Sequence, residues 1–221
     1  MPFTPGERTS RRVGLPRGRG FRARRRGQAL VEFALIFPLF IVLLLAIIEF
    51  MFLFNAQLSL NFATRDAALV AAEAGNNANA DCEILQKIDS DLSAPTDETK
   101  LLTVHIYSAS ETGDQLATPK EQTYTRGGAT TCGSLTVPYT LGTNNYPYNI
   151  RCNDLDRTGC GGGFTGPTNT GVDIIGVQLD YGYRFVTPVS SAFVLLGTAQ
   201  LWGGAGMQMN VANAMRMEPI L

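Results

Sequence analysis

The stretch that decides the fold is QALVEFALIFPLFIVLLLAIIEFMFLF, residues 28–54. Sixteen consecutive residues between Glu32 and Glu49 carry no charge. With its flanks, the stretch exceeds the roughly 20 residues that a helix needs to cross the hydrocarbon core of a bilayer. A surface helix of a soluble protein keeps a polar face, and residues 33–48 have none. We therefore expect a transmembrane helix over residues 28–54, which Pro38 kinks or restarts.

Charge is segregated on the two sides of this segment. Residues 1–27 hold nine Arg and one acidic residue, Glu7, which gives a net charge of +8. The other 194 residues hold nine basic and eighteen acidic side chains, a net charge of −9. The chain is therefore a basic tail and an acidic body joined by an apolar helix, and its overall charge of −1 hides this division.

Four arginines directly precede the apolar segment: Arg22, Arg24, Arg25 and Arg26. Short positively charged flanks remain on the cytoplasmic side of a membrane. We therefore expect residues 1–27 in the cytoplasm and the acidic body outside it. A basic tail can also bind nucleic acid. This tail adjoins an anionic lipid surface instead, so we expect the bilayer, and no nucleic acid, as its partner.

Two other interpretations of the apolar segment stay open. One is the core helix of a soluble protein, and the other is a signal that is removed after export. The apolar region is long for a secretory signal, and Phe54-Asn55-Ala56 lacks the small residues of a cleavage site. Ser10-Arg11-Arg12 resembles a twin-arginine signal, but a second arginine cluster separates it from the span.

Glu32 places a carboxylate five residues into the apolar segment. A charged carboxylate costs about 2.5–3.5 kcal/mol at the centre of a span, and less near the interface. One interpretation is that Glu32 lies shallow and reaches the headgroups. The other is that it meets a cation within the membrane.

The motif Arg26-Gly27-Gln28-Ala29-Leu30-Val31-Glu32-Phe33-Ala34, followed by Pro38, resembles the amino terminus of the TadE-like family. These proteins are minor pilins or pseudopilins of the Tad (Flp) branch of type IV pili. The resemblance covers about residues 22–75 and returns faintly at residues 214–218. Phe33 stands where major Flp pilins more often have Tyr, although Phe is usual in the TadE-like group.

The resemblance implies cleavage by a prepilin peptidase between Gly27 and Gln28, which makes Glu32 the fifth residue of the mature chain. The amine freed at Gln28 is cationic at neutral pH, so it is able to neutralise Glu32 of a neighbouring subunit. The implied location is the bacterial inner membrane, and the implied partners are the peptidase, other Tad pilus proteins and pilin subunits.

The helix is expected to continue beyond the span, over residues 28–74 in total. Leu58, Phe62, Leu69 and Ala72 fall near one face at helical spacing, and Gly75 with the two Asn that follow ends the helix. A second, alanine-rich face would let other helices approach closely, or it reflects only helix propensity; it comprises Ala63, Ala67, Ala71 and Ala74.

Residues 76–221 form the exported domain. A short helix is expected over residues 81–92 and strands over 99–107, 172–187 and 207–217. In the first strand, Leu102, Val104 and Ile106 share one face. In the second, the alternating residues from Ile175 to Phe185 share one face. We expect an α+β fold, in which a long transmembrane helix continues into a stalk and packs on a small antiparallel sheet.

Two stretches of this domain depart from regular patterns. Residues 123–171 hold ten of the 23 Gly and are expected to form a long Gly/Thr-rich loop region, with a short strand at residues 133–137. This region either binds a partner or is a tolerated insertion. Residues 190–202 form a second apolar run, short for a span, which we interpret as a core helix or an interfacial segment.

All four cysteines lie beyond the span, on the oxidising side: Cys82, Cys132, Cys152 and Cys160. Two disulfides are expected, with three possible connectivities. We favour Cys82 with Cys132 and Cys152 with Cys160, because the second bond would close the Gly-rich loop locally. No CxxC pair supports a zinc site.

Catalytic and metal-binding motifs find little support in the sequence. Asp154 begins a segment like the first half of a calcium loop, but its twelfth position is Thr165 and not Glu. The acidic residues Glu73, Asp81, Glu83, Asp97 and Glu98 are interpreted as solvated surface. The single His, His105, is interpreted as a sheet residue. We expect no metal, no cofactor and no enzymatic activity.

Two functions therefore fit the sequence. The first is a minor pilin-like component of Tad pilus assembly, with a leader over residues 1–27, a span over 28–54, a helical stalk over 55–75 and an exported domain over 76–221. It would join or prime the pilus through its N-terminal helix. The second is an uncut single-pass anchor that presents a ligand- or partner-binding domain outside the cytoplasm.

Overall fold

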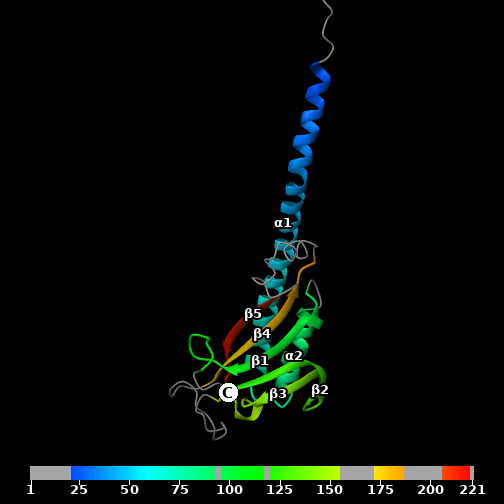
Figure 1. Ribbon diagram of the computed structural model, residues 1–221. Helices are drawn as coiled ribbons and strands as arrows, with labels where there is room; N and C mark the ends of the chain where they lie inside the picture. The colour runs from blue at the N-terminus through cyan, green and yellow to red at the C-terminus, as the bar shows by residue number, and fades with distance from the viewer. Residues whose placement is uncertain (1–20, 93–95, 117–119, 155–171, 187–205, 220–221) are drawn as a thin grey trace, which may run out of the picture. The chain divides into compact units, whose positions relative to one another are not determined.

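The computed structural model describes residues 21–92, 96–116, 120–154, 172–186 and 206–219, with side chains from residue 27 onward. Two compact units make up the chain, Met1–Leu44 and Leu45–Leu221, and each is described by itself. The elements run α1 (Phe21–Ala74), α2 (Ala80–Asp91), η1 (Glu98–Lys100), β1 (Leu101–Ser108), β2 (Glu121–Cys132), β3 (Leu135–Asn144), η2 (Tyr148–Ile150), β4 (Ile174–Arg184) and β5 (Gly206–Arg216) (Figure 1). The expected α+β fold is confirmed.

The described part of the first unit is the beginning of α1. This helix starts at Phe21, seven residues earlier than predicted, because the arginine-rich segment before Gly27 contains good helix formers. It also continues through Pro38 without interruption. Within the described residues, α1 is the one helix long and apolar enough to cross a membrane.

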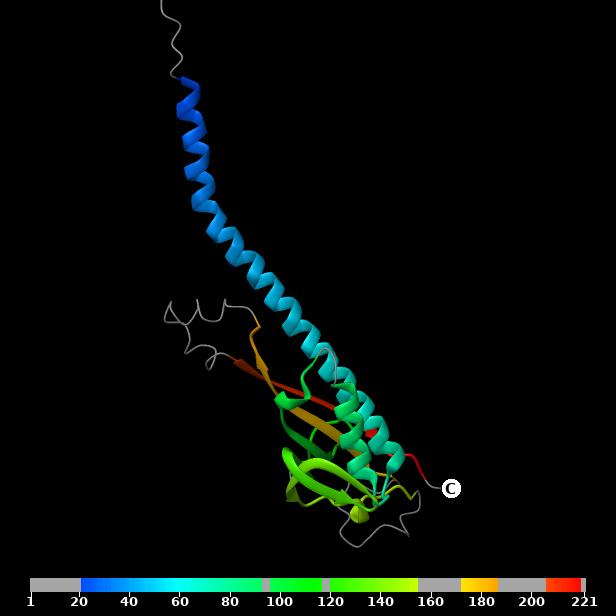
Figure 2. The same ribbon diagram turned by 90° about the vertical axis from the view of Figure 1, so that its right-hand side faces the viewer.

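The second unit is a five-stranded antiparallel sheet in the order β3-β2-β1-β4-β5. The C-terminal part of α1 and the short α2 lie on one face of this sheet (Figure 2). The predicted helix over residues 81–92 and the predicted last two strands are confirmed as α2, β4 and β5. The core is formed between the helices and this sheet face.

The inward face of α1 differs from the predicted one. Leu58, Phe62 and Leu69 are exposed, by 42%, 63% and 45%. The buried face is formed by small residues and one Leu: Ala56, Leu60, Ala63, Thr64, Ala67, Ala68, Ala71 and Ala72. The predicted alanine-rich face is thus buried in the domain of its own chain, where Ala63, Ala67 and Ala71 belong to the core that the helices and the sheet form.

One residue of β1 faces the wrong way for the predicted alternation. Val104 and Ile106 are fully buried, but Leu102 is 47% exposed. The pairing of β1 with β4 shifts in register between Leu101 and Thr103. This irregularity turns Leu101 inward in place of Leu102, since one extra residue reverses the alternation of a strand.

The predicted loop over residues 123–171 is wrong in its first part. Residues 121–144 form the β2–β3 hairpin, and the predicted short strand over residues 133–137 is divided between its turn and β3. Gly127 and Gly128 have positive φ and lie where the register shifts between Arg126 and Thr130. The glycines therefore mark a bulge, and the threonines favour a strand. Residues 155–171 and the apolar run at 190–202 lie outside the described residues.

Candidate assembly and anchoring site

The predicted processing bond lies within α1 and not at its start. Gly27 and Gln28 are both in helical backbone, with the backbone of Arg22, Arg24, Arg25 and Arg26 in the turns before them. Gly27 is exposed, and a Cβ added there would meet nothing within 4 Å outside its own helix. The described residues therefore leave the Gly27–Gln28 bond uncovered.

Glu32 is exposed one turn after Gln28. Its carboxylate accepts a hydrogen bond from the Gln28 side-chain Nε2 at 3.1 Å. Its neighbour Phe33 is 61% exposed, so the carboxylate stands on a helix with no covered face. No ion pair to Glu32 is formed by the side chains that the structure describes. This carboxylate is thus accessible to a cation from another molecule.

Glu49 joins α1 to the sheet domain, and the sequence analysis did not single it out. Although it follows Ile48 and precedes Phe50, both exposed, it is only 7% exposed itself. Its Oε1 accepts hydrogen bonds from the Tyr183 hydroxyl at 2.7 Å and from the Val186 backbone N–H at 3.0 Å. A carboxylate inside an apolar helix needs donors, and that requirement is the signal that could have identified it.

The hydrogen bond to Glu49 also affects the pKa of the Tyr183 hydroxyl. Its pKa is raised above the usual value, first by burial and then by the hydrogen bond to, and the negative charge of, Glu49. Tyr183 also meets Phe185 edge to face, with ring centroids 5.8 Å apart. The end of β4 is therefore attached to α1 at Glu49.

The far end of α1 is attached to the sheet by the end of the chain. The Asn213 side chain donates to the buried Thr64 hydroxyl at 2.8 Å, and the Glu218 N–H donates to the Ala72 carbonyl at 3.0 Å. Met217 is buried and donates its N–H to the Asp173 carbonyl. The segment at residues 214–218, which resembles a frequent family ending, thus packs beside the last turn of α1.

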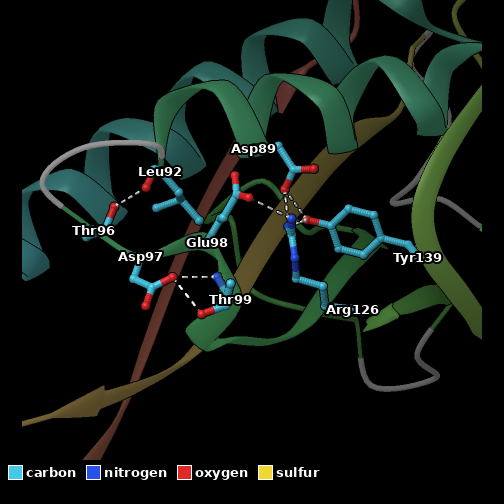
Figure 3. A network of polar contacts seen from close by, with 8 residues as sticks. All are labelled: Asp89, Leu92, Thr96, Asp97, Glu98, Thr99, Arg126 and Tyr139. Atoms are coloured by element: carbon cyan, nitrogen blue, oxygen red, sulfur yellow. Dashed lines mark hydrogen bonds and ion pairs between the residues drawn. The ribbon is translucent and has the colours of Figure 1, made fainter. Parts of the chain in front are cut away.

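Two of the acidic residues expected on a solvated surface, Asp97 and Glu98, are at least partly exposed and also take part in a polar network. Figure 3 shows Arg126 of β2 between Asp89 of α2 and Glu98 of η1, whose carboxylate lies 3.1 Å from the Arg126 Nη2. The Tyr139 hydroxyl of β3 donates to the same Asp89 oxygen at 2.6 Å. Asp97 accepts from the N–H and hydroxyl of Thr99. This network joins four elements of the domain.

Asp81 is the clearest departure from a solvated position. It is 5% exposed and accepts from the Tyr124 hydroxyl at 2.9 Å and from Arg151, which is itself buried. Arg151 also lies over the Tyr146 ring, 5.2 Å from its centroid. A buried ion pair of this kind connects α2 to the segment after η2 and serves the packing of the domain.

A disulfide joins Cys82 of α2 to Cys132 at the end of β2. This is one half of the pairing that the sequence analysis favoured. Cys152 is buried, and Cys160 lies outside the described residues, so the second favoured bond stays a prediction.

The outer face of the sheet carries the single histidine. The two ring nitrogens of His105 lie 3.4 Å from Glu121 and 3.2 Å from Asp180. Within the described ranges, no group of three or more His, Cys, Asp or Glu side chains is arranged to hold a metal ion. Most of the calcium-like segment after Asp154 lies outside these ranges.

These features define a class of protein: one apolar N-terminal helix whose second part packs on an antiparallel α+β domain. Residues 27–69 match the family model described as TadE-like protein. The predicted resemblance is confirmed over this segment, which contains Gly27, Gln28 and Glu32, and it relates the chain to Tad pilus components. No curated protein and no solved structure matches the chain.

Proposed function

We propose that this protein is a minor pilin-like component of a Tad (Flp) pilus, without enzymatic activity. A prepilin peptidase cuts it between Gly27 and Gln28, and the new N-terminal helix joins or primes the pilus. The N terminus faces the cytoplasm, and the sheet domain lies outside the inner membrane. The alternative is an uncut anchor whose outer domain binds a partner.

The observation that carries this proposal is the state of Glu32. It is an accessible carboxylate near the start of the apolar segment of α1, five residues after an uncovered glycine. Such a carboxylate is costly in lipid unless a cation meets it. The amine that cleavage creates at Gln28 of a neighbouring subunit supplies that cation.

Two further features support the proposal. Beyond Glu49, the outward side of α1 keeps large exposed apolar residues, namely Phe54, Leu58, Phe62 and Leu69. A row of this kind suits contact with the helix of a neighbouring subunit. The Cys82–Cys132 disulfide supports an oxidising compartment for the domain.

Co-expression with a Tad-type prepilin peptidase tests the processing step. We expect intact mass and N-terminal sequencing to show a new terminus at Gln28, and Gly27→Leu to abolish it. Glu32→Gln is expected to leave membrane insertion intact and to remove the protein from the pilus fraction. Glu73→Gln is the matched control, since Glu73 is an exposed carboxylate on the same helix beyond the apolar segment.

The outcomes separate the two functions. A full-length product in the presence of an active peptidase would contradict the pilin proposal and favour the uncut anchor. Normal incorporation of the Glu32→Gln variant would remove the proposed role of the carboxylate, even if cleavage occurs.

A further inference from the structure

The burial of side chains on helix α1 changes at Glu49. Up to Ile48, its large apolar side chains are exposed on every face of the helix. From Leu53 onward, one face packs against the sheet, beginning with Ala56 and Leu60. The 21 residues from 28 to 48 span about 31 Å at 1.5 Å per residue, which matches the roughly 30 Å hydrocarbon core of a bilayer.

The contacts of Glu49 place the hydrocarbon boundary at this residue. Lipid tails offer no donor to a carboxylate, whereas Glu49 accepts from the Tyr183 hydroxyl and the Val186 N–H. The end of β4 therefore reaches the level of Glu49. Non-helical backbone such as that at Val186 does not enter hydrocarbon when it faces lipid. The membrane surface thus lies at or just before Glu49, and not at Phe54.

The same end of the sheet exposes apolar and basic side chains together. Val186 is 65% exposed, and Leu102 of β1 is 47% exposed and lies over Gly182 of β4. Arg184, two residues before Val186, is exposed and forms no ion pair among the described side chains. On α1, Phe50 follows Glu49 and is 67% exposed. We call Phe50, Leu102, Arg184 and Val186 the rim.

We propose that the rim rests on the headgroups of an anionic phospholipid bilayer, and that the Glu49 contacts set the depth of the domain. Phe50 lies two residues after Ile48 on α1, and the Val186 N–H donates to Glu49 between them, so lipid that surrounds Ile48 also meets Phe50 and Val186. Apolar side chains enter the interface while Arg184 meets the phosphates. This inference rests on the membrane anchor of the proposed function but not on cleavage or pilus assembly.

The opposite end of the sheet supplies a matched control. Thr112 lies in the exposed turn after β1, and the Ala109 N–H of this connection donates to the Ile174 carbonyl at the start of β4. Arg184 lies ten positions after Ile174 along β4, about 33 Å at 3.3 Å per residue. A probe at Thr112 therefore reports the part of the domain remote from the rim.

The experiment uses the full chain with its native cysteines oxidised, reconstituted into phosphatidylglycerol–phosphatidylcholine vesicles. One added cysteine carries an environment-sensitive fluorophore, at Leu39, Val186 or Thr112. Quenchers are attached to lipids, either on the headgroup or deep in the acyl chain. We expect the acyl-chain quencher to act on a fluorophore at Leu39. We expect headgroup quenching to be severalfold stronger at Val186 than at Thr112. A fourth labelled variant, Leu102→Cys, is expected to be quenched as strongly as Val186.

Each result decides between the two proposals. If Leu39 is quenched but Val186 and Leu102 resemble Thr112, the rim does not contact lipid and this inference alone fails. If Leu39 is not quenched, the membrane anchor of the proposed function fails as well. Arg184→Glu is expected to lower headgroup quenching at Val186 in anionic vesicles and not in pure phosphatidylcholine. If Arg184→Glu lowers headgroup quenching equally in both lipids, the charge of Arg184 has no role in binding the phosphates.

Discussion

Two carboxylates in one apolar segment have opposite surroundings. Glu49 is covered and accepts hydrogen bonds from a tyrosine hydroxyl and a backbone N–H of its own chain. Glu32 is exposed, and its one described hydrogen bond comes from Gln28. A buried charge must be compensated within the fold, so Glu49 belongs to the domain. Glu32 forms no ion pair with the described side chains, which is why the proposed assembly role falls on it.

The hydrogen bonds of Glu49 predict that two substitutions at this position lower the stability of the domain by different amounts. Glu49→Gln keeps an oxygen that accepts from Tyr183 and Val186, so we expect a small effect. Glu49→Leu leaves two donors unsatisfied, and we expect it to lower the free energy of unfolding by about 2 kcal/mol or more. Denaturant unfolding of the full chain in detergent, followed by near-ultraviolet circular dichroism, measures both. Glu73→Leu serves as an exposed control, and wild-type unfolding of Glu49→Leu would contradict the prediction.

At the scale of elements, helix α1 presents two unlike faces to its surroundings. The face on the sheet is built of small residues, and the outward face keeps large apolar ones such as Phe62 and Leu69. In a soluble monomer the arrangement would be the reverse, with large residues inward. The small residues of the inward face belong to the core of the domain, and the large apolar residues of the outward face stay exposed.

The difference between the two faces of α1 predicts that substitutions at neighbouring positions change the stability of the domain by different amounts. Ala67 is fully buried, so Ala67→Leu forces extra volume into a close contact and is expected to cost about 1–3 kcal/mol of stability. Leu69→Ala changes an exposed residue two positions away and is expected to cost less than about 0.5 kcal/mol in detergent. Thermal unfolding of both variants checks the order. A larger loss in Leu69→Ala would place the sheet on the other face of α1.

The disulfide between α2 and β2 makes a second prediction at this scale. It joins residues 50 positions apart, and a loop of that size corresponds to about 4 kcal/mol of stabilisation in the chain-entropy model. We expect Cys82→Ser with Cys132→Ser to lower the free energy of unfolding by a comparable amount. Unfolding at an unchanged denaturant concentration would show that the bond adds nothing to the stability of the domain.

For the whole molecule, buried tyrosine hydroxyls connect the sheet to the helices and loops. The chain has seven tyrosines, and the pKa of six of them is raised, chiefly by burial: Tyr107, Tyr124, Tyr139, Tyr146, Tyr181 and Tyr183. Negative neighbours add to this effect, including Asp81 beside Tyr124 and Asp89 beside Tyr139. The folded domain therefore disfavours ionisation of these groups.

The raised pKa values predict alkaline unfolding. Unfolded tyrosines ionise near pH 10. Because the folded values lie higher, the stabilisation is fully present below pH 10 and is lost as the pH rises above it. Phenolate absorbance and circular dichroism of the full chain in detergent, recorded across this range, are expected to change together. Full tyrosine ionisation with an intact domain would contradict the prediction.

Much of the architecture follows from local chemistry, and the sequence alone was sufficient for it. The uncharged run before Glu49 requires an apolar helix, the glycine and asparagines after Ala74 end it, and the alternation from Ile175 to Tyr183 makes a strand with one buried face. The motif around Gly27 and Glu32 likewise indicated the family that matches residues 27–69. These features depend on residues that are close together in the sequence, so they can be predicted without knowledge of the tertiary structure.

Tertiary packing alone decided which faces are buried and which polar groups meet. Helical spacing offered two candidate faces of α1, and in the folded domain the alanine-rich face is buried while Leu58, Phe62 and Leu69 stay exposed. The register shift in β1 exposed Leu102, and strand pairing converted an expected loop into the β2–β3 hairpin. Glu49 and Tyr183 lie 134 residues apart. A contact over that separation depends on the path of the whole chain, which no local pattern contains.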